Sequence, residues 1–437
     1  MIVFGENLVY TYKPRMNRIE GVRLLSRIRR WSRVPALLPL CFATVAVSAQ
    51  TLTTLYSFDG ADGAQPTAGL VEATDGDLYG TTLEGGAYRS GSVFRITPSG
   101  VLTTLYSFCS QSACEDGAEP YGGLVQAGSG SLYGTTEYGG GNNECTSDIG
   151  CGTVFRISLS GKLTTLYRFC SQAACADGNS PLPAPAPHGG GIPGTTRALG
   201  CGTVFKIDPA GALTTLYRFC SQNANPCMDG QTPLAGLVWT TSETLYGTTE
   251  YGGTGVNCCV QGCGTIFRIT PSGKLATIYN FSCSASNCPD GIWPIGGLVQ
   301  GADGDLYGTT PNEGAGLQGT VFKLGPTGTL TTLHNFCVVS ACADGANPVA
   351  ALVQSADGTF YGTTRSGGAR EAFGTLFSIT PAGAFATLSS FDGANGANPS
   401  GALFQGANGD LYGTTRYGGA SGVGASSGTI FIASISN

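Results

Sequence analysis

The sequence predicts an all-β protein, a seven-bladed β-propeller of four-stranded antiparallel blades, and two observations carry this prediction. First, one unit of about fifty to sixty residues recurs seven times between residue 52 and residue 437, a period typical of stacked supersecondary units. The copies are clearest at a motif close to Gly-Thr-(Val/Ile/Leu)-Phe, whose aromatic residues are Phe94, Phe155, Phe205, Phe267, Phe322, Phe377 and Phe431. Second, each unit contains short runs rich in Val, Ile, Thr, Tyr and Phe, separated by Gly, Pro and Asp, as expected for antiparallel strands.

The first unit shows the four expected strands in order, and we name them A to D. Strand A is expected in residues 68–73, strand B in 77–82, strand C in 92–96 and strand D in 102–108. Asp-Gly between A and B, and Pro-Ser-Gly between C and D, predict tight turns, because Gly adopts positive φ and Pro presets the first corner. Such units repeated around an axis form a propeller; a β-solenoid is the alternative, but its coils are shorter and its turns less regular.

The ends of the repeat region predict how the ring closes. Residues 52–58 resemble a strand D with no strand A before it, and residues 428–432 form a strand C with no strand D after it. The first strand is therefore expected to complete the last blade, which removes a free sheet edge. In the third unit, residues 180–196 replace the usual A–turn–B sequence, and the prolines there cannot donate to a sheet ladder, so we expect irregular inner strands.

The composition restricts the class of partner. The chain is 41% hydrophobic and 11% charged with a formal net charge of -6, which argues against disorder. A nucleic-acid-binding protein needs a basic surface to neutralise phosphates, so we expect no nucleic-acid partner. We expect residues 50–437 to form a single monomeric domain that holds no cofactor and no metal.

The N-terminus predicts export. Basic residues between Arg27 and Arg33 precede an apolar run, Val34 to Val47, and Val47-Ser48-Ala49 is a small-residue cleavage pattern. We interpret residues 1–49 as a signal peptide, with Met16 as an alternative start. A retained membrane anchor is the other interpretation, but the run is shorter than the about twenty residues that a span needs. We therefore expect a periplasmic, cell-surface or extracellular protein that does not associate with the membrane after cleavage.

Cysteine usage agrees with export. The chain has 17 cysteines, and sixteen remain once Cys41 of the expected signal is set aside. An even number of cysteines in an exported chain favours disulfides over zinc binding. Local spacing predicts the pairs Cys109/Cys114, Cys145/Cys151, Cys170/Cys175, Cys220/Cys227, Cys283/Cys288 and Cys337/Cys342. We expect Cys263 to bond Cys258 or Cys259, which leaves the other of these two for Cys201.

The repeated motifs resemble a known family. LYGTT, GTVFRI followed by TP, G and LTTLY-x-F, and DG-x-x-P are similar to the choice-of-anchor tandem-repeat proteins of the GloVer type (Gloeo_Verruco repeat), over residues 52–437. The resemblance implies an exported bacterial protein, and several members carry a C-terminal sorting or anchoring segment. We find no such segment after the last repeat here, and this difference from the family leaves surface anchoring open. The resemblance implies no established activity and supplies no catalytic residues.

One face of the predicted propeller is the candidate functional surface. Because strand direction alternates, the D–A and B–C connections emerge on one face, and this face carries the long loops and the expected disulfides. The residue after Gly-Thr-Thr varies along that face, where it is Leu83, Glu137, Arg197, Glu250, Pro311, Arg365 or Arg416, and Tyr138, Tyr251 and Tyr417 follow three of these positions. From these we select Glu137, Tyr138, Glu250, Tyr251, Arg365, Arg416 and Tyr417 as candidate ligand-binding residues near the channel mouth. The alternative is that they form ion pairs among themselves on a solvated rim.

The Asp/Asn-Gly-x-x-Pro element also has two interpretations. It begins at Asp62, Asp116, Asp177, Asp229, Asp290, Asp344 and Asn395. Calcium takes six to eight oxygen ligands, and one acidic residue per copy supplies too few, so turn formation explains the element better.

Three functions remain open from the sequence. The first is a binding or interaction module at the cell envelope or outside the cell, with a glycan or a surface protein as partner. The second is a hydrolase or lyase acting on a polysaccharide or small substrate, in which Glu137 and Glu250 serve as paired carboxylates. The third is a purely structural repeat protein. Neither His188 nor His334 has a motif-level Ser or Cys partner, so catalytic residues stay unassigned.

Overall fold

The structure is a computed structural model that describes most of the chain from residue 51 onward. The residues outside this description are 1–50, 129, 142–144, 146–149, 182–190, 198–200, 221–226, 256–260, 285–286, 370–372, 421–426 and 436–437. The expected signal peptide of residues 1–49, together with His188, Cys258 and Cys259, therefore lies outside the described residues.

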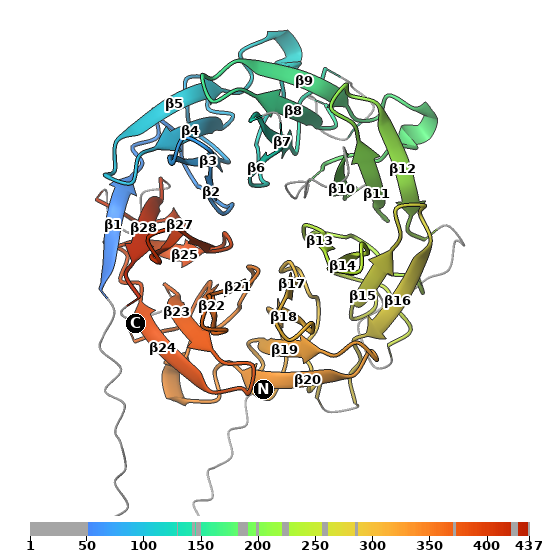
Figure 1. Cartoon of the computed structure of the whole chain (residues 1–437), viewed down its shortest axis with the longest axis vertical. Helices are drawn as coiled ribbons and strands as arrows, with labels where there is room; N and C mark the ends of the chain where they lie inside the picture. Colours follow the sequence, from blue (N-terminus) through green and yellow to red (C-terminus); the bar gives the residue numbers. More distant parts are fainter. Residues whose placement is uncertain are drawn as a thin grey trace, which may run out of the picture. The chain divides into compact units, whose positions relative to one another are not determined.

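Seven sheets stand in a ring, and each sheet is one blade of a β-propeller (Figure 1). Blade 1 contains β2 (Val71–Glu72), β3 (Leu78–Thr82), β4 (Ser92–Ile96) and β5 (Leu102–Ser107), and blade 2 contains β6 (Val125–Gln126), β7 (Leu132–Thr136), β8 (Thr153–Ile157) and β9 (Leu163–Arg168). Blade 3 contains β10 (Ile192–Thr196), β11 (Thr203–Ile207) and β12 (Leu213–Arg218), and blade 4 contains β13 (Val238–Trp239), β14 (Leu245–Thr249), β15 (Thr265–Ile269) and β16 (Leu275–Asn280). Blade 5 contains β17 (Val299–Gln300), β18 (Leu306–Thr310), β19 (Thr320–Leu324) and β20 (Leu330–Asn335), and blade 6 contains β21 (Val353–Gln354), β22 (Phe360–Thr364), β23 (Thr375–Ile379) and β24 (Phe385–Ser390). Blade 7 contains β25 (Ala397–Pro399), β26 (Phe404–Gln405), β27 (Leu411–Tyr417) and β28 (Thr429–Ala433), completed by β1 (Leu52–Ser57). The predicted seven-bladed β-propeller is confirmed.

Ring closure by the N-terminal strand is also confirmed. β1 pairs antiparallel with β28, so that Leu52 lies opposite Ala433 and Ser57 opposite Thr429. The chain then passes into blade 1, and the amide of Phe58 still donates to the carbonyl of Gly428 at 3.1 Å. The outer strand of the last blade therefore comes from the opposite end of the described chain, and each of the seven blades has its outer strand.

Strand A is shorter than the six residues expected from the sequence. In blade 1 it is reduced to the two residues of β2. The preceding backbone bonds to a neighbouring blade instead of to its own ladder: Thr414 of blade 7 donates its hydroxyl to the carbonyl of Ala68 at 2.9 Å. The same contact joins Thr81 to Gly122 at 3.0 Å and Thr309 to Ala350 at 3.1 Å. The first Thr of LYGTT thus links blades, which explains both the motif and the short inner strand.

A pair of phenylalanines fills each of the seven seams between blades. One Phe follows strand D and the other comes from strand C of the next blade, and their rings meet edge to face. The pairs are Phe58–Phe94, Phe108–Phe155, Phe169–Phe205, Phe219–Phe267, Phe281–Phe322, Phe336–Phe377 and Phe391–Phe431, with centroids 5.1–5.6 Å apart. Edge-to-face packing is favourable for aromatic rings, and these rings are almost fully buried. The repeated Phe positions are therefore core residues between blades.

The Gly of LYGTT leaves room for the strand C phenylalanine of its own blade. In blade 5, Gly308 lies opposite Phe322 in the ladder, and a Cβ at Gly308 would lie 2.6 Å from the Cζ of that ring. We expect Gly308→Ala to lower the free energy of unfolding by about 1–3 kcal/mol, as overpacking does in a tight core. Urea denaturation would measure this loss. Gly128→Ala is the matched control, because a Cβ there meets nothing within 4 Å; an equal effect of the two changes would contradict the packing argument.

Blade 3 has three strands among the described residues. Its β10 follows the sequence Ile-Pro-Gly-Thr-Thr and keeps the register of the other blades, with Gly194 opposite Phe205. Within the described residues, 192–196 form a regular strand in which Pro193 lies opposite Lys206. The irregularity expected from the Pro-rich sequence of this blade stays a prediction. Residues 182–190, which carry the Pro-rich sequence, lie outside the description.

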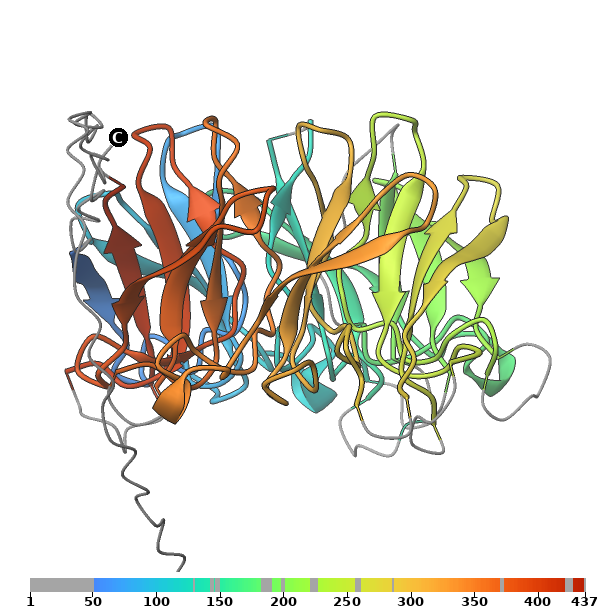
Figure 2. The same ribbon diagram turned by 90° about the horizontal axis from the view of Figure 1, so that it is seen from below.

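The two faces of the ring differ as expected. Figure 2 shows the tight hairpins on one face and the longer connections on the other, together with the short 3₁₀ helices η1 (Ser112–Cys114), η2 (Ala173–Cys175) and η3 (Ser340–Cys342). We call the second side, which carries the D–A and B–C connections, the looped face. All six predicted local disulfides are present on it. Cys263 is also disulfide-bonded, whereas Cys201 is a free thiol, so the expected link from Cys201 to the Cys258/Cys259 pair is not formed.

A search for membrane-spanning helices found none in the part of the chain that the structure describes.

Candidate binding site on the looped face

Two residues of each blade meet where strand B reaches the looped face. One follows Gly-Thr-Thr, and the other precedes the Pro of the Asp-Gly-x-x-Pro element. In five blades a backbone hydrogen bond of 3.0–3.2 Å joins them, as from Glu137 N to Glu119 O and from Arg365 N to Asn347 O at 3.0 Å. Pro311 has no N–H and cannot donate this bond. We call the two sets together the mouth ring: Leu83, Glu137, Arg197, Glu250, Pro311, Arg365 and Arg416, with Gln65, Glu119, Ser180, Thr232, Trp293, Asn347 and Asn398.

The residues before the prolines adopt an unusual backbone conformation. Although none is Gly, their φ angles lie between 47° at Ser180 and 59° at Trp293. Such conformations cost on the order of 1–3 kcal/mol each and persist where surrounding contacts impose them. Here the imposing contact is a backbone hydrogen bond to the preceding blade. The backbone N–H of Asn347 donates to the carbonyl of Gln318 at 2.8 Å, and the backbone N–H of Glu119 donates to the carbonyl of Ser90 at 2.8 Å.

These pre-proline residues were missed in the sequence. The available signal was a residue that varies among copies while the adjacent Pro is repeated, which is the pattern of a fixed backbone that presents different side chains. Their strained backbone and position beside the Gly-Thr-Thr residues place them in the candidate site.

An acidic sector of the mouth ring surrounds one arginine. The Arg197 Nη1 atom lies 4.0 Å from the Glu137 Oε1 atom. Burial raises the pKa of both Glu137 and Glu250, and the Arg197 guanidinium opposes that rise at each carboxyl. Arg197 therefore acts on both predicted acids, and this part of the ring matches the interpretation of ion pairing within the rim.

Glu119 adds a third carboxyl to this sector. Burial raises its pKa first, and the neighbouring charges of Glu137 and Glu84 raise it further. Burial also raises the pKa of the Tyr138 hydroxyl, and the adjacent Glu137 carboxylate adds to that rise. Glu137 and Glu84 are thus the carboxylates that act electrostatically on Glu119, and Glu137 takes part in both the Glu119 and the Arg197 interactions.

The predicted tyrosines have contacts within the protein. The Tyr251 ring packs edge to face on Trp293, with centroids 5.7 Å apart. Tyr417 ends β27, and the Arg416 guanidinium lies 5.2 Å from its ring centroid. Arg416 also donates from Nε to the Gln65 Oε1 atom at 2.9 Å. Arg416 and Tyr417 are therefore already engaged with each other and with blade 1.

Arg365 is in a different position, because it lines a cavity. The cavity has a volume of ≈ 330 Å³ and is lined by Ile295, Pro311, Asn312, Asn347, Val349, Arg365, Ser366 and Asn398, from blades 5, 6 and 7. The Arg365 side chain is exposed and makes no ion pair with any residue in the described ranges. It is the predicted site residue that the structure brings to a hollow lined by polar groups.

Side-chain amides in this cavity have fixed orientations. Asn347 donates from Nδ2 to the Pro311 carbonyl at 2.8 Å, and Asn398 donates from Nδ2 to the Arg365 carbonyl at 2.8 Å. The side-chain Oδ1 atom of Asn347 accepts a hydrogen bond from the Ser366 hydroxyl at 2.6 Å. Ile295 and Val349 supply an apolar part of the wall. A small number of oriented polar groups beside apolar surface is typical of a small-molecule site.

The aspartates of the Asp-Gly-x-x-Pro element are structural. A strand D tyrosine donates its hydroxyl to the carboxylate in the pairs Tyr56–Asp62, Tyr106–Asp116, Tyr167–Asp177, Tyr217–Asp229 and Tyr279–Asp290. In blade 5, His334 takes the place of the tyrosine, with its Nε2 atom 3.2 Å from the Asp344 Oδ2 atom. Burial lowers the pKa of His334, and the neighbouring Asp344 opposes this. Each carboxylate thus holds its loop against the preceding strand, in addition to the turn that was predicted.

The fold and the mouth ring together define a seven-bladed β-propeller of tandem repeats, fastened by disulfides on its looped face. A family model described as the Gloeobacter/Verrucomicrobia repeat matches residues 41–201, 147–291, 198–343 and 260–437. The chain belongs to this family, as the repeated motifs indicated.

Other comparisons give lower similarity. The search of curated proteins found no match. Among solved structures, a gluconolactonase of Xanthomonas campestris shows 12% identity and a TM-score of 0.42, with 88% of this chain and 89% of that chain covered. A luciferin-regenerating enzyme shows 11% identity and a TM-score of 0.40, with 70% and 87% covered.

Proposed function

We propose that the protein is an exported binding module that holds a polar, hydroxyl-rich ligand such as a glycan at the mouth ring. One observation carries this proposal: the ≈ 330 Å³ cavity combines the Arg365 guanidinium, which makes no ion pair within the described ranges, with oriented amide groups of Asn347 and Asn398. Sugar hydroxyls both donate and accept hydrogen bonds, and fixed partners bind them without further loss of side-chain entropy.

Export is part of the proposal and is supported by the disulfides. Six local disulfides are present, and such bonds persist in oxidising compartments and are rare in the cytosol. The ligand is therefore expected outside the cytoplasm, at the cell envelope or beyond it.

A glycan array followed by calorimetry on each hit tests the proposal. We expect Arg365→Ala to weaken binding about tenfold or more, since hydrogen bonds to charged groups are worth about 1.5–3 kcal/mol. Arg268→Ala is the matched control, because Arg268 is an exposed arginine of β15, in strand C of another blade. Binding that is equally unaffected by both changes would contradict a site at this cavity, and binding to a surface protein without any glycan hit would replace the ligand class.

A second candidate, a hydrolase or lyase acting on a polysaccharide or small substrate, rests on the acidic sector. Burial raises the pKa of Glu119, Glu137 and Glu250, and a raised carboxyl pKa suits a general acid near neutral pH. Turnover of any array hit, abolished by Glu137→Gln or Glu250→Gln with binding retained, would favour this candidate. Binding without turnover in the unaltered protein would exclude it for that ligand.

A further inference from the structure

Three consecutive blades carry a cysteine at the same seam position. The residue before the Gly that leads into strand C is Cys151 in blade 2, Cys201 in blade 3 and Cys263 in blade 4. Each is followed by a disulfide in the next D–A connection: Cys170–Cys175, Cys220–Cys227 and Cys283–Cys288, respectively. The same local fold therefore places sulfur atoms together three times.

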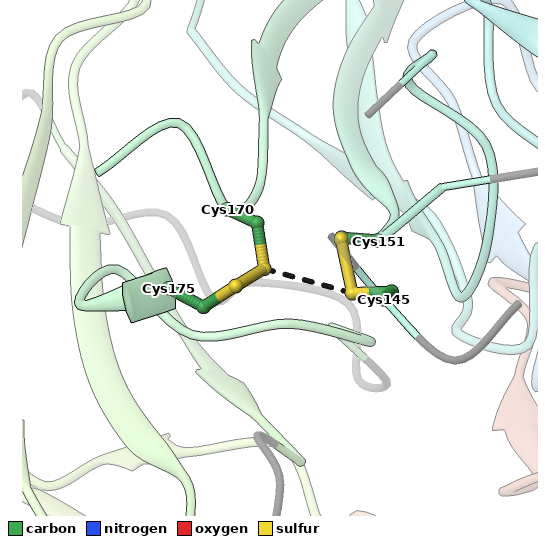
Figure 3. A group of neighbouring side chains, drawn as sticks. All are labelled: Cys145, Cys151, Cys170 and Cys175. Carbon is green, nitrogen blue, oxygen red and sulfur yellow. Dashed lines mark hydrogen bonds between the residues drawn. A yellow bond between two sulfur atoms is a disulfide. The ribbon is translucent and has the colours of Figure 1, made fainter. Parts of the chain in front are cut away.

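In blades 2 and 4 the neighbouring sulfurs that the structure describes are all in disulfides. Figure 3 shows the Cys145–Cys151 disulfide beside the Cys170–Cys175 disulfide, with the Sγ atoms of Cys145 and Cys170 3.6 Å apart. In blade 4 the Sγ atoms of Cys263 and Cys283 are also 3.6 Å apart, and both residues are disulfide-bonded. Among the described residues, neither of these clusters contains a thiol that could exchange with its disulfides.

Blade 3 has a thiol at the equivalent place. Cys201 is free and half-buried, and its Sγ atom lies within 4.8 Å of the Sγ atoms of both Cys220 and Cys227. The disulfide of Cys220 and Cys227 also lines a cavity of ≈ 270 Å³, where Met228 is 52% exposed. A thiol thus lies beside a disulfide whose two cysteines also line an open cavity.

We propose that Cys201, Cys220 and Cys227 form a thiol–disulfide exchange centre. The Cys201 thiolate attacks the Sγ atom of Cys220 or Cys227, a new disulfide forms to Cys201, and the Cys220–Cys227 bond breaks. The displaced cysteine leaves as a thiolate and takes the proton that Cys201 gave up. One disulfide is exchanged for another, so the step needs no oxidant and no reductant.

Exchange is slow at neutral pH and faster at alkaline pH. Burial raises the pKa of the Cys201 thiol, the Asp229 carboxylate raises it further, and the Arg218 guanidinium opposes both. Only the thiolate is the nucleophile, and below the thiol pKa its fraction falls about tenfold per pH unit. The native Cys220–Cys227 pairing is therefore kinetically protected near neutrality.

Disulfide mapping tests the proposal on the unaltered protein. The protein is held at pH 7 and at pH 9 without added thiol, quenched in acid, alkylated with N-ethylmaleimide and digested without reduction for mass spectrometry. We expect alkylation to spread from Cys201 to Cys220 and Cys227, with peptides linking Cys201 to Cys220 or Cys227, and to do so about a hundredfold faster at the higher pH. The pair Cys170–Cys175, whose described neighbours include no thiol, is the built-in control and should remain unlabelled.

Cys201→Ser should abolish labelling of Cys220 and Cys227 while leaving the melting temperature within a few degrees of the original. Labelling of Cys220 and Cys227 that persists in this variant would overturn the proposal. The proposal would also be overturned if the unaltered protein shows only the Cys220–Cys227 disulfide at both pH values, and if N-ethylmaleimide labels only Cys201 among these three cysteines. A bond from Cys201 to Cys258 or Cys259 would overturn it as well, because Cys201 would then not be a thiol.

Discussion

Deleting residues 51–58 should lower the melting temperature by on the order of 10 °C or more and turn one cooperative transition into a broad one. This segment contains β1, which supplies the outer strand of blade 7 through its pairing with β28. Its loss exposes the ladder groups of Thr429–Ala433 as a free edge.

The packing at the closing seam explains the size of this effect. Phe58 is 2% exposed, and its ring meets Phe94 of blade 1 edge to face at 5.3 Å. Phe58 also belongs to the buried core that contains Ile430 of β28, and the partly buried Leu55 packs against this core. Truncating one buried Phe costs about 3–5 kcal/mol, and the deletion removes the backbone pairing as well.

Differential scanning calorimetry and peptide complementation check the expectation together. A synthetic peptide of residues 50–59 added to the deleted protein should bind at β28 and restore much of the lost stability, whereas a scrambled peptide should not. An unchanged melting profile in the deleted protein would contradict closure through β1. Loss of stability without rescue would show that the deletion damages the core but that β1 cannot dock on its own.

The architecture could be predicted because its cause is repeated in the sequence. Each LYGTT copy places a Gly under a strand C Phe, as with Gly308 and Phe322, and its first Thr links to the neighbouring blade. One substitution in one copy does not hide a pattern that occurs seven times. The local disulfides were predictable for the same reason, since short spacings such as Cys170 to Cys175 recur at one place in the unit.

The candidate site could be predicted only in part, because it is formed between copies. The sequence marks Glu137 and Glu250 as variable positions, but it does not say that Arg197 lies near both. Nor does it reveal the residues before the prolines, whose backbone is held by a carbonyl of the preceding blade. Such contacts depend on how blades pack, and a copy-by-copy analysis cannot supply them.

The buried carboxylate of Asp116 gives the second large expected effect. Asp116 is 0% exposed and accepts hydrogen bonds from the Tyr106 hydroxyl at 2.8 Å, from the Ser110 amide at 2.9 Å and from the Ser110 hydroxyl at 2.8 Å. Asp116→Asn replaces one accepting oxygen by an NH₂ group that faces these donors. We expect the free energy of unfolding to fall by about 3 kcal/mol, because buried donors are left without an acceptor.

Asp75→Asn is the matched control for this change. Asp75 also accepts a tyrosine hydroxyl, from Tyr79 at 2.7 Å, but Asp75 is exposed, so the amide oxygen of the variant can accept this bond while its NH₂ group lies in water. We expect it to cost less than about 1 kcal/mol. Urea denaturation of both variants under non-reducing conditions measures the difference, and equal losses would mean that burial of Asp116 does not set the strength of the contact.

A double-mutant cycle then assigns the effect to the contact with Tyr106. Tyr106→Phe alone should lower the free energy of unfolding by about 1 kcal/mol. In the Asp116→Asn background the same change should lower it by less, because the Tyr106 hydroxyl has already lost its acceptor there. The chain contains a natural counterpart: where blade 6 meets blade 7, Ser389 occupies the tyrosine position and Asn395 the aspartate position. There the side-chain Oδ1 atom of Asn395 accepts a hydrogen bond from the backbone N–H of Asp392 at 2.9 Å instead. Additive losses in the cycle would contradict the coupling, whereas a large coupling energy would explain why both partners differ together at that seam.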